Sequence, residues 1–464
     1  MSQIVLNNSN VPQPAHLLDL PEKVLQFGTG VLLRGLPDYF IHCANQKGVF
    51  SGRVVVVKST SKGGTDEFTH QDNFFTHLTR GVYKGQVVNT HFINTSISRV
   101  LVAKKDWALL LALAKTDSIE VVISNTTEAG LVIEEGDVMN EQAPLSFPAK
   151  LLVLLFTRWK HYNGDIDKGW VILPTELVPD NGNLLLQLMQ KLATKWGLPS
   201  AFMDWMINAN EFCNTLVDRI VPGILTSDEM DNFSKEIGYK DDLLLTSEPF
   251  ALWAIECSNE KAKKKMSFTA IDESIVVAPS IVKFRELKLR MLNGTHTFCC
   301  GVALLAGFET VVEAMNDASF YKFISTLVFN EIVPCVVSEN ITQEDAKKFG
   351  ERVLERFANP FIKHKWTSIS LNFEEKMKMR NQYLIEKYFE KCNVIAQQMS
   401  LGFAAFKIYM QKVHQKQINT ADYSTNASFA VKVQAWEEAI AQKGIQKILL
   451  YQDDIVSWKQ GMSI

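Results

Sequence analysis

The chain of 464 residues is 47% hydrophobic and 21% charged, which suits two or three domains with large buried cores and excludes an intrinsically disordered chain. Its 48 Lys and Arg residues against 51 Asp and Glu give a net charge of −3, so the broad basic field of a nucleic-acid binder is lacking. Up to residue 280 there are 25 basic and 32 acidic residues, and after it 23 and 19, an asymmetry that suits an anionic substrate. We expect no nucleic-acid partner.

The seven cysteines are scattered and show no CxxC spacing, so the sequence predicts neither a disulfide framework nor a zinc module. Residues 1–14 lack the charged and apolar regions of a signal peptide. No window holds the run of about 18 apolar residues that a membrane span needs. We therefore expect a cytoplasmic protein with no membrane partner and no metal.

The first part of the chain alternates predicted strands and helices. Residues 23–35 (KVLQFGTGVLLRG) give an apolar run, a Gly-x-Gly turn and a segment of helical spacing that continues to about residue 45. Residues 53–58 (RVVVVK) are typical of a parallel strand buried on both faces. Further strands are predicted at 119–124, 169–174, 250–256 and 274–277, a hairpin at 74–78 and 86–93, and helices at 107–114, 148–162 and 184–196. This alternation indicates an α/β, doubly wound, Rossmann-type domain.

Beyond about residue 282 the pattern changes, and amphipathic segments dominate. They are separated by Gly350, Pro360 and the polar stretch 419–426. We predict an all-helical second domain, with residues 1–280 and 281–464 as the two domains. Because no flexible linker intervenes, we expect the domains to meet across a cleft, where ligands tend to bind.

The GTG turn at residues 28–30 directly follows a predicted buried strand. Glycines there permit a tight turn and close approach of a pyrophosphate, which a helix N-terminus favours. The third glycine of the dinucleotide fingerprint is replaced by Leu33, and the second strand ends in KST at 58–60 without the acidic partner of the ribose. On these residues the turn is either a cofactor site or a structural turn, and Lys58 leaves NADP open. Arg34 is either a surface residue, an anchor of the loop or a phosphate contact.

A second candidate site begins the helical domain, in KLRMLNGTH at residues 288–296. On an α-helix Asn293 lies about 140° and His296 about 80° around the axis from Lys288, so one face can present all three. Burial and the like charge of Arg285 would lower the pKa of Lys288 and let it exchange a proton near neutrality. Arg285 would otherwise bind a substrate carboxylate.

Plainer interpretations of the same residues stay open: a solvated lysine, an Asn-Gly cap and a core histidine. A metal site made by His296 with Cys299 and Cys300 is not favoured, because adjacent cysteines diverge on a helix and a fourth ligand is not indicated.

Five blocks of the sequence resemble the polyol-specific long-chain dehydrogenases, the mannitol dehydrogenase family. They are LQFGTGVLLRG at 25–35, SNTTEAG at 124–130, NTLVDRIVPG at 214–223, KLRMLNGTHT at 288–297 and RFANPFIKH at 356–364. Two linking blocks, DKGWVILPTEL at 167–177 and GVALLAGFETVVEAMND at 301–317, are most similar to the branch that acts on hexuronates. The resemblance spans nearly the whole chain.

The resemblance implies an NAD-dependent, metal-independent enzyme that acts on a keto-uronate or the corresponding aldonate. It implies that Lys288 is the general acid/base and that Asn293 and His296 polarise and orient the reacting oxygen, which gains negative charge during hydride transfer. The cofactor contacts that we assign are Gln26, Phe27, Gly28, Thr29, Gly30, Val31, Leu32, Leu33, Arg34, Asn125 and Thr126. The substrate contacts that we assign are Asp218, Arg219, Lys363 and His364.

One position departs from the family pattern. Where the mannitol branch carries a second oxyanion asparagine, this chain has Leu177, preceded by Glu176. Either Asn293 acts without that partner, or Glu176 and Thr175 take a different role, and mannitol is disfavoured as the substrate.

Several alternatives remain. Asp218 either supports His296 or the substrate, or forms a structural salt bridge, and the carboxylate partner is left open among Arg285, Arg219, Lys363 and His364. The rival functions are a reductase of another hexuronate, a mannitol-type dehydrogenase and a non-catalytic dinucleotide-binding sensor. The intact trio at 288, 293 and 296 argues against the sensor.

Overall fold

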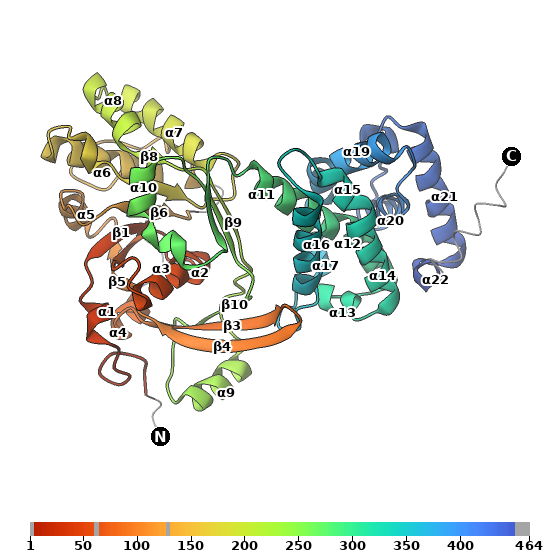
Figure 1. Cartoon of the computed structure of the whole chain (residues 1–464), viewed down its shortest axis with the longest axis horizontal. Helices are drawn as coiled ribbons and strands as arrows, with labels where there is room; N and C mark the ends of the chain where they lie inside the picture. Colours follow the sequence, from red (N-terminus) through yellow and green to blue (C-terminus); the bar gives the residue numbers. More distant parts are fainter. Residues whose placement is uncertain (1–3, 60–64, 127–129, 451–464) are drawn as a thin grey trace. The chain divides into compact units, whose positions relative to one another are not determined.

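The computed structural model describes residues 4–59, 65–126 and 130–450 (Figure 1). The chain divides into two compact units. The first consists of Met1–Arg80 and Val88–Ile281, and the second of Gly81–Val87 and Val282–Ile464. Thr60 and residues 127–129 of the SNTTEAG block lie outside the described residues.

A six-stranded parallel sheet forms the centre of the first unit, in the order β5-β2-β1-β6-β7-β8. Its strands are β1 (Glu22–Phe27), β2 (Arg53–Lys58), β5 (Ile97–Val102), β6 (Val121–Ser124), β7 (Val171–Pro174) and β8 (Glu211–Phe212). The chain leaves β1 toward β2 and β5, and returns to β1's other side with β6. This reversal is the switch point of a doubly wound Rossmann sheet, where ligands bind beyond the carboxyl ends of the strands. The predicted fold class is confirmed.

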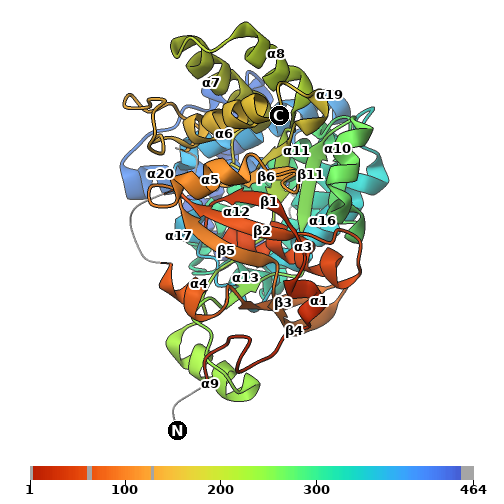
Figure 2. The same ribbon diagram turned by 90° about the vertical axis from the view of Figure 1, so that its left-hand side faces the viewer.

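Helices cover both faces of this sheet (Figure 2). Leu25 and Val55 point into one core with α5–α8, whereas Val24 and Val54 point into another core with α2 and α3. The helices are α2 (Val31–Gly35), α3 (Pro37–Gln46), α5 (Trp107–Leu113), α6 (Phe147–His161), α7 (Asn181–Lys195) and α8 (Ser200–Ala209). The single helix expected from residue 31 to about 45 is therefore wrong. It breaks at Leu36, because the proline at position 37 begins a new helix.

Two three-stranded sheets complete the first unit, in the orders β10-β3-β4 and β12-β11-β9. Their strands are β3 (Phe75–Tyr83), β4 (Gln86–Asn94), β9 (Thr215–Asp218), β10 (Leu245–Ser247), β11 (Leu252–Glu256) and β12 (Ile275–Ala278), and the remaining helices are α1 (Ala15–Leu18), α4 (Asp66–His70), α9 (Ser227–Ile237) and α10 (Glu260–Lys265). The predicted hairpin is β3–β4, whose two-residue turn has φ of 51° at Lys84 and 75° at Gly85. The tip of this hairpin groups with the second unit, where the Gly85 N–H donates to Glu355 at 3.1 Å.

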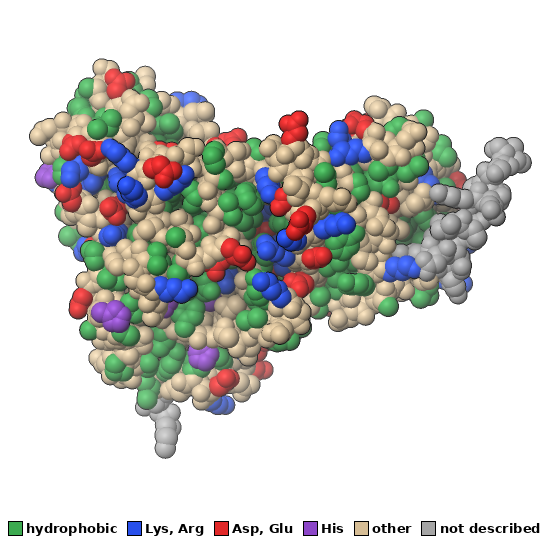
Figure 3. Space-filling model, viewed as in Figure 1, with side chains coloured by type: hydrophobic (Ala, Val, Ile, Leu, Met, Phe, Trp, Pro, Cys, Tyr) green, Lys and Arg blue, Asp and Glu red, His purple; other side chains and the backbone are tan. Residues whose placement is uncertain are grey.

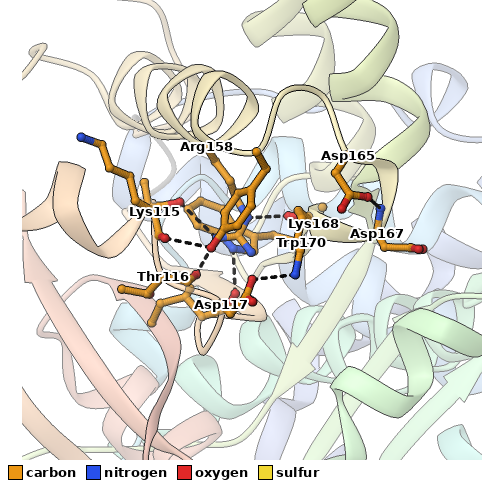
Figure 4. Close-up of polar contacts among 12 residues, drawn as sticks. Lys115, Thr116, Asp117, Arg158, Asp165, Asp167, Lys168 and Trp170 are labelled. Atoms are coloured by element: carbon orange, nitrogen blue, oxygen red, sulfur yellow. Dashed lines mark hydrogen bonds and ion pairs between the residues drawn. The ribbon is translucent and has the colours of Figure 1, made fainter.

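Arg158 joins several loops at the amino-terminal edge of the six-stranded sheet (Figure 4). Its guanidinium donates to the carbonyls of Ala114 at 3.1 Å and Thr116 at 2.7 Å, and also to that of Lys168. It lies over the Trp170 ring, 5.0 Å from the centroid. The charge is buried, and the main-chain oxygens around it supply the hydrogen bonds that water would otherwise make.

Every regular element described in the second unit after Val282 is helical. These elements are α11 (Val282–Glu286), α12 (Gly294–Ala306), α13 (Val311–Met315), α14 (Ala318–Thr326), α15 (Val333–Val336), α16 (Gln343–Phe357), α17 (Trp366–Ile369), α18 (Phe373–Lys376), α19 (Gln382–Cys392), α20 (Gln397–His414), α21 (Ala427–Lys443) and α22 (Ile445–Leu450), with short 3₁₀ and π turns. Helices α12 and α20 pack backbone to backbone. A Cβ at Gly301 would lie 2.7 Å from the Phe406 nitrogen, and one at Gly402 would lie 2.7 Å from the Phe298 oxygen.

Basic and acidic side chains are interspersed on the face drawn in Figure 3, and neither sign covers a broad continuous area there. Within the described residues, no helix has both the length and the hydropathy needed to cross a bilayer.

Candidate active site

The Gly-x-Gly turn leaves β1 at the switch point of the six-stranded sheet. Gly28 has φ of +132°, and a Cβ there would meet the Leu33 side chain at 2.8 Å and the Asn125 oxygen at 2.9 Å. Only glycine fits that position, because both the backbone conformation and the space require it. Gly30, by contrast, has ordinary extended angles, and a Cβ there would meet nothing within 4 Å. The protein fills the space beside Gly28 and leaves the space beside Gly30 open to a ligand.

The segment after β6 lies against this turn. The Asn125 side chain donates to the Thr175 oxygen and hydroxyl, each at 3.0 Å. The Thr126 N–H and hydroxyl both donate to Glu176, each at 3.0 Å, and the Ser124 hydroxyl donates to the other carboxylate oxygen at 3.1 Å. Burial raises the pKa of Glu176, and these hydrogen bonds oppose that rise. Glu176 thus fixes the residues that follow β6, a positioning role that the sequence did not specify.

The other residues assigned to the cofactor differ in what their side chains can reach. Gln26 is fully buried and donates to Asp38 at 3.1 Å, and Phe27 packs against Phe147 with ring centroids 4.9 Å apart. Leu33 is buried in the core, whereas Thr29, Val31 and Leu32 are half-buried at the turn. The side chains of Gln26, Phe27 and Leu33 point into the protein interior, so only the backbone of these three residues is left to contact a ligand.

Arg34 is an internal anchor and not a surface residue. Its guanidinium is buried, donates to the Leu243 carbonyl and lies over the Phe75 ring at 5.4 Å from the centroid. Burial lowers its pKa, and the nearby carboxyl groups of Asp241 and Asp38 oppose that effect.

Asp218 and Arg219, assigned to the substrate from the sequence, lie at the end of β9 in the first unit, and both are buried. The Arg219 guanidinium donates to the carbonyls of Glu248 at 3.0 Å and Gly35 at 2.8 Å, and lies 4.4 Å from the Tyr39 ring centroid. These partners make Arg219 a structural cation that links β9 to α2.

Lys288 and Asn293 lie on a π-helical segment, Leu287–Asn293, and not on the regular α-helix that the sequence predicted. The N–H of Gly294 donates to the Leu289 oxygen, the five-residue spacing of a π-turn. Because π hydrogen bonds join residues five apart, Lys288 and Asn293 lie about one turn apart. The angle of about 140° expected for an α-helix is therefore wrong, and the two groups lie closer in direction. A second π segment, Met377–Asn381, contacts the residue that directly follows this one, because the Asn381 side chain donates to the Gly294 oxygen at 2.9 Å.

His296 lies in the first turn of α12 and is almost fully buried, with 8% of its surface exposed. Its ring stacks on Phe357 with centroids 3.9 Å apart and meets His364 edge-on at 5.3 Å. Its Nε2 is buried and has no hydrogen-bond partner among the described residues. An unpartnered buried nitrogen calls for an explanation, and a ligand atom bound at Nε2 would supply one.

The charged groups that act on His296 are basic. Burial holds the pKa of His296 well below its usual range, and His364, Arg356, Arg380 and Lys376 lower it further, so the ring is neutral near pH 7. The Arg380 guanidinium donates to the Thr297 hydroxyl at 3.2 Å, and its Nε is buried with no partner among the described residues. Lys376 donates to the Ile369 carbonyl at 3.1 Å. We call His364, Lys376 and Arg380 the basic cluster.

Of the substrate residues assigned from the sequence, His364 joins this cluster, whereas Lys363 is exposed. Sequence analysis missed Lys376 and Arg380, which belong to a helical stretch about 80 residues beyond His296 and resemble ordinary surface charges. Cys299 and Cys300 are buried in the core, and Cys300 donates to the Trp366 carbonyl at 3.4 Å. Within the described residues they form no metal-ligating group with His296.

Family comparisons cover nearly the whole chain. The mannitol dehydrogenase Rossmann domain matches residues 22–267, and the mannitol dehydrogenase C-terminal domain matches residues 280–459. The chain is 40% identical over 397 residues to an altronate oxidoreductase of Halalkalibacterium halodurans, covering 85% of this chain and 76% of the relative. It is 37% identical over 390 residues to an altronate oxidoreductase of Bacillus subtilis, covering 84% and 80%.

Solved structures share the fold at low sequence identity. A D-sorbitol dehydrogenase in substrate-free form aligns with a TM-score of 0.79 at 17% identity, covering 95% of this chain and 99% of that one. A Pseudomonas fluorescens mannitol 2-dehydrogenase, solved with NAD and D-mannitol, aligns with a TM-score of 0.68 at 17% identity, covering 97% and 99%. With both domain models matched in order and relatives at 37–40% identity, this chain belongs to the mannitol dehydrogenase family.

Proposed function

We propose that this protein is an altronate oxidoreductase, which interconverts D-altronate and D-tagaturonate with NAD as the hydride carrier. The observation that carries the proposal is the 37–40% identity to altronate oxidoreductases over about four fifths of the chain. The basic cluster adds a physical reason for a sugar acid, because its two cations, Lys376 and Arg380, can stabilise a carboxylate, and the buried Nε of Arg380 has no partner among the described residues. The seven cysteines of the protein are free thiols, a state that a reducing compartment maintains. We therefore place the enzyme in the cytoplasm.

The turn after β1 suits the pyrophosphate of a dinucleotide. The open space beside Gly30 and the position at the switch point support this assignment, and Asn125 and Thr126 border the same end of the sheet. NAD, when bound, accepts or supplies the hydride of the reaction. Lys58 is buried at the end of β2, and its substitution would test whether this residue decides the preference between NADH and NADPH.

In the direction of altronate oxidation, Lys288 takes the proton of the reacting hydroxyl while the hydride leaves the same carbon. Asn293 donates a hydrogen bond to the oxygen as negative charge develops on it, and the π-turn supports this pairing because it brings the two side chains one turn apart. His296 is neutral, so it orients a substrate hydroxyl through Nε2 and does not act as the acid. In the reverse direction Lys288 returns the proton to the alkoxide.

The test is steady-state kinetics of the full chain and of Lys288→Ala. We expect NADH oxidation with tagaturonate, and a fall in kcat of about two to four orders of magnitude in the variant, the usual contribution of a general acid/base. NADH binding, followed by fluorescence, should be retained. Lys283→Ala, on the same helical stretch and paired with Asp345, is the matched control and should keep most of the turnover. Retained turnover in Lys288→Ala would remove this lysine from its role.

Substrate identity is tested by rates on tagaturonate, fructuronate and fructose under the same conditions. We expect the highest kcat/KM for tagaturonate. A preference for fructuronate would move the assignment to another hexuronate reductase, and a preference for fructose would move it to a polyol dehydrogenase. No NADH oxidation with any of the three would favour a non-catalytic dinucleotide-binding protein.

A further inference from the structure

Two thiols and a carboxylate meet in the first unit, in residues that the proposed reaction does not use. Glu211 begins β8, Cys213 directly follows it, and Cys257 directly follows β11. One carboxylate oxygen and the two sulfur atoms all lie within 4.8 Å of one another. In the described part of the chain, no other three His, Cys, Asp or Glu side chains come together in this way.

The spacing of the three atoms fits a zinc ion. Zinc binds thiolate sulfur at about 2.3 Å and carboxylate oxygen at about 2.1 Å, so two sulfurs on one tetrahedral ion lie about 3.8 Å apart. The three atoms therefore need to close by no more than about 1 Å. Two thiolates favour zinc over magnesium or calcium, which prefer oxygen ligands alone.

The main chain holds the three residues in place before any metal binds. The N–H of Glu211 donates to the Trp170 oxygen at 2.9 Å, and that of Cys213 to the Ile172 oxygen at 3.0 Å. The N–H of Cys257 donates to the Ala278 oxygen at 2.9 Å. The ligands thus come from strand ends that are fixed in two different sheets, β8 of the six-stranded sheet and β11 of the β12-β11-β9 sheet.

The carboxylate is oriented by a neighbour, as metal ligands usually are. Asn259 donates through Nδ2 to one oxygen of Glu211 at 2.9 Å, which leaves the second oxygen for a metal. Cys213 and Cys257 are 1% and 2% exposed, whereas Glu211 is only half-buried. The sulfur side is closed, and the carboxylate side offers an entry path and room for a water molecule as the fourth ligand.

We propose that Glu211, Cys213 and Cys257 form a zinc site that ties the edge of the six-stranded sheet to the β12-β11-β9 sheet. The sequence predicted no metal, because the two cysteines are 44 positions apart and match no short ligand spacing. The site does not depend on the proposed oxidoreductase activity, and its role is to stabilise the first unit.

The test titrates the full chain, stripped with a chelator and kept under a thiol reductant, with zinc against a chromophoric chelator. We expect one equivalent to bind. Cys213→Ser and Cys257→Ser should abolish this equivalent, and Cys392→Ser, which removes an exposed thiol, should keep it. Cadmium should give a thiolate charge-transfer absorption in the wild type and in Cys392→Ser only. Because the fold is tied by the metal, saturating zinc should also raise the Tm of the wild type.

Glu211→Gln guards against cysteine variants that fail to fold, because this side chain is partly exposed. We expect it to weaken zinc binding by about 10-fold or more while the thermal unfolding of the metal-free protein stays unchanged. The proposal is overturned if zinc fails to bind in a 1:1 ratio, or if binding survives both cysteine substitutions. A third outcome also overturns it: Cys213 and Cys257 of the metal-free protein form a disulfide in air, and the protein binds no zinc after this disulfide is reduced.

Discussion

Three buried arginines, Arg158 and Arg219 in the first unit and Arg380 in the second, differ in the partners of their guanidinium groups. In the first unit, the Arg158 guanidinium donates to three main-chain carbonyls and lies over the Trp170 ring (Figure 4). The Arg219 guanidinium donates to two main-chain carbonyls and lies over the Tyr39 ring. In the second unit, Arg380 leaves its buried Nε without a partner in the described residues, and the neighbouring His296 leaves Nε2 in the same state. Burying polar groups without hydrogen bonds costs about 1–3 kcal/mol each. An unpartnered Nε alone does not mark a binding site, because the buried Nε atoms of Arg34 and Arg53 in the first unit are also without a partner in the described residues. What sets Arg380 apart is that it acts on His296 and lowers its pKa, so we expect Arg158 and Arg219 to be architectural and Arg380 to belong to a binding site.

The largest expected effect is on the free energy of unfolding, when a buried arginine that holds main-chain carbonyls is replaced. Arg158→Met would leave three carbonyls without their donor, and we expect a loss of roughly 3 kcal/mol or more in the free energy of unfolding. Urea denaturation followed by circular dichroism measures it. Lys191→Met, an exposed position on α7, is the control and should change stability by less than about 0.5 kcal/mol. If both variants unfold at the same urea concentration as the wild type, the carbonyl network has no architectural role.

A second prediction asks whether a buried charge in the second unit that does have partners behaves as architecture. Glu331 accepts the N–H groups of Gln398 and Met399, each at 2.8 Å, at the start of α20. Burial raises its pKa to about 7, and those N–H groups oppose the rise. Because the folded-state pKa is above the unfolded one, the folded protein holds a proton that the unfolded chain has lost. Stability from this group is full below the unfolded pKa and falls as pH rises toward 7.

Chemical denaturation at several pH values measures this effect as the difference between the wild type and Glu331→Gln. Between the two pKa values the wild type should lose stability relative to the variant by up to about 1.4 kcal/mol per pH unit, and the difference should become constant above pH 7. Activity with saturating substrate should follow folded protein only. A difference that stays constant across the whole range would show that Glu331 does not change its protonation in this window.

Elements that are encoded by local sequence patterns could be predicted, whereas features that depend on tertiary contacts could not. The strands β1 and β2 were predicted because β-branched runs buried on both faces are a local signal. β5 was not predicted, since Ser98 and Arg99 interrupt its apolar pattern, and only the contact of Arg99 with Glu22 at 2.8 Å explains the charge. The π-turn at 287–293 was invisible for a similar reason. A helical periodicity does not reveal an inserted residue, and the widening is supported by contacts such as Arg290 donating to Met379 at 2.8 Å.

A smaller effect tests the unpartnered cation directly. Arg380→Gln removes a charged donor from the basic cluster, and we expect KM for tagaturonate to rise by about 10- to 100-fold, or roughly 1.4 to 2.7 kcal/mol, with kcat less affected. The rate with fructose, which has no carboxylate, should change far less. Stability should stay within about 1 kcal/mol of the wild type.

Lys412→Gln, an exposed position on α20, is the kinetic control for this substitution. Equal losses on tagaturonate and fructose in Arg380→Gln would mean that the cation supports the fold of the site and does not recognise the carboxylate. The selectivity ratio between the two substrates is therefore the decisive measurement.

The smallest expected effects concern Gly28 and Gly30 of the turn, where we compare a structural role with a binding role. Gly30→Ala places a methyl group in space that the protein leaves open, so folding stability should change by less than about 0.5 kcal/mol, while KM for NADH should rise by about 10-fold as the methyl meets the pyrophosphate. Gly28→Ala places the methyl against Leu33 and Asn125 in a strained conformation, so it should lose stability first. Thermal unfolding without cofactor and NADH titration of both variants separate the two effects. Gly30→Ala with unchanged NADH affinity would show that the open space beside Gly30 is not where the cofactor binds, and the turn would then be architectural like Arg158.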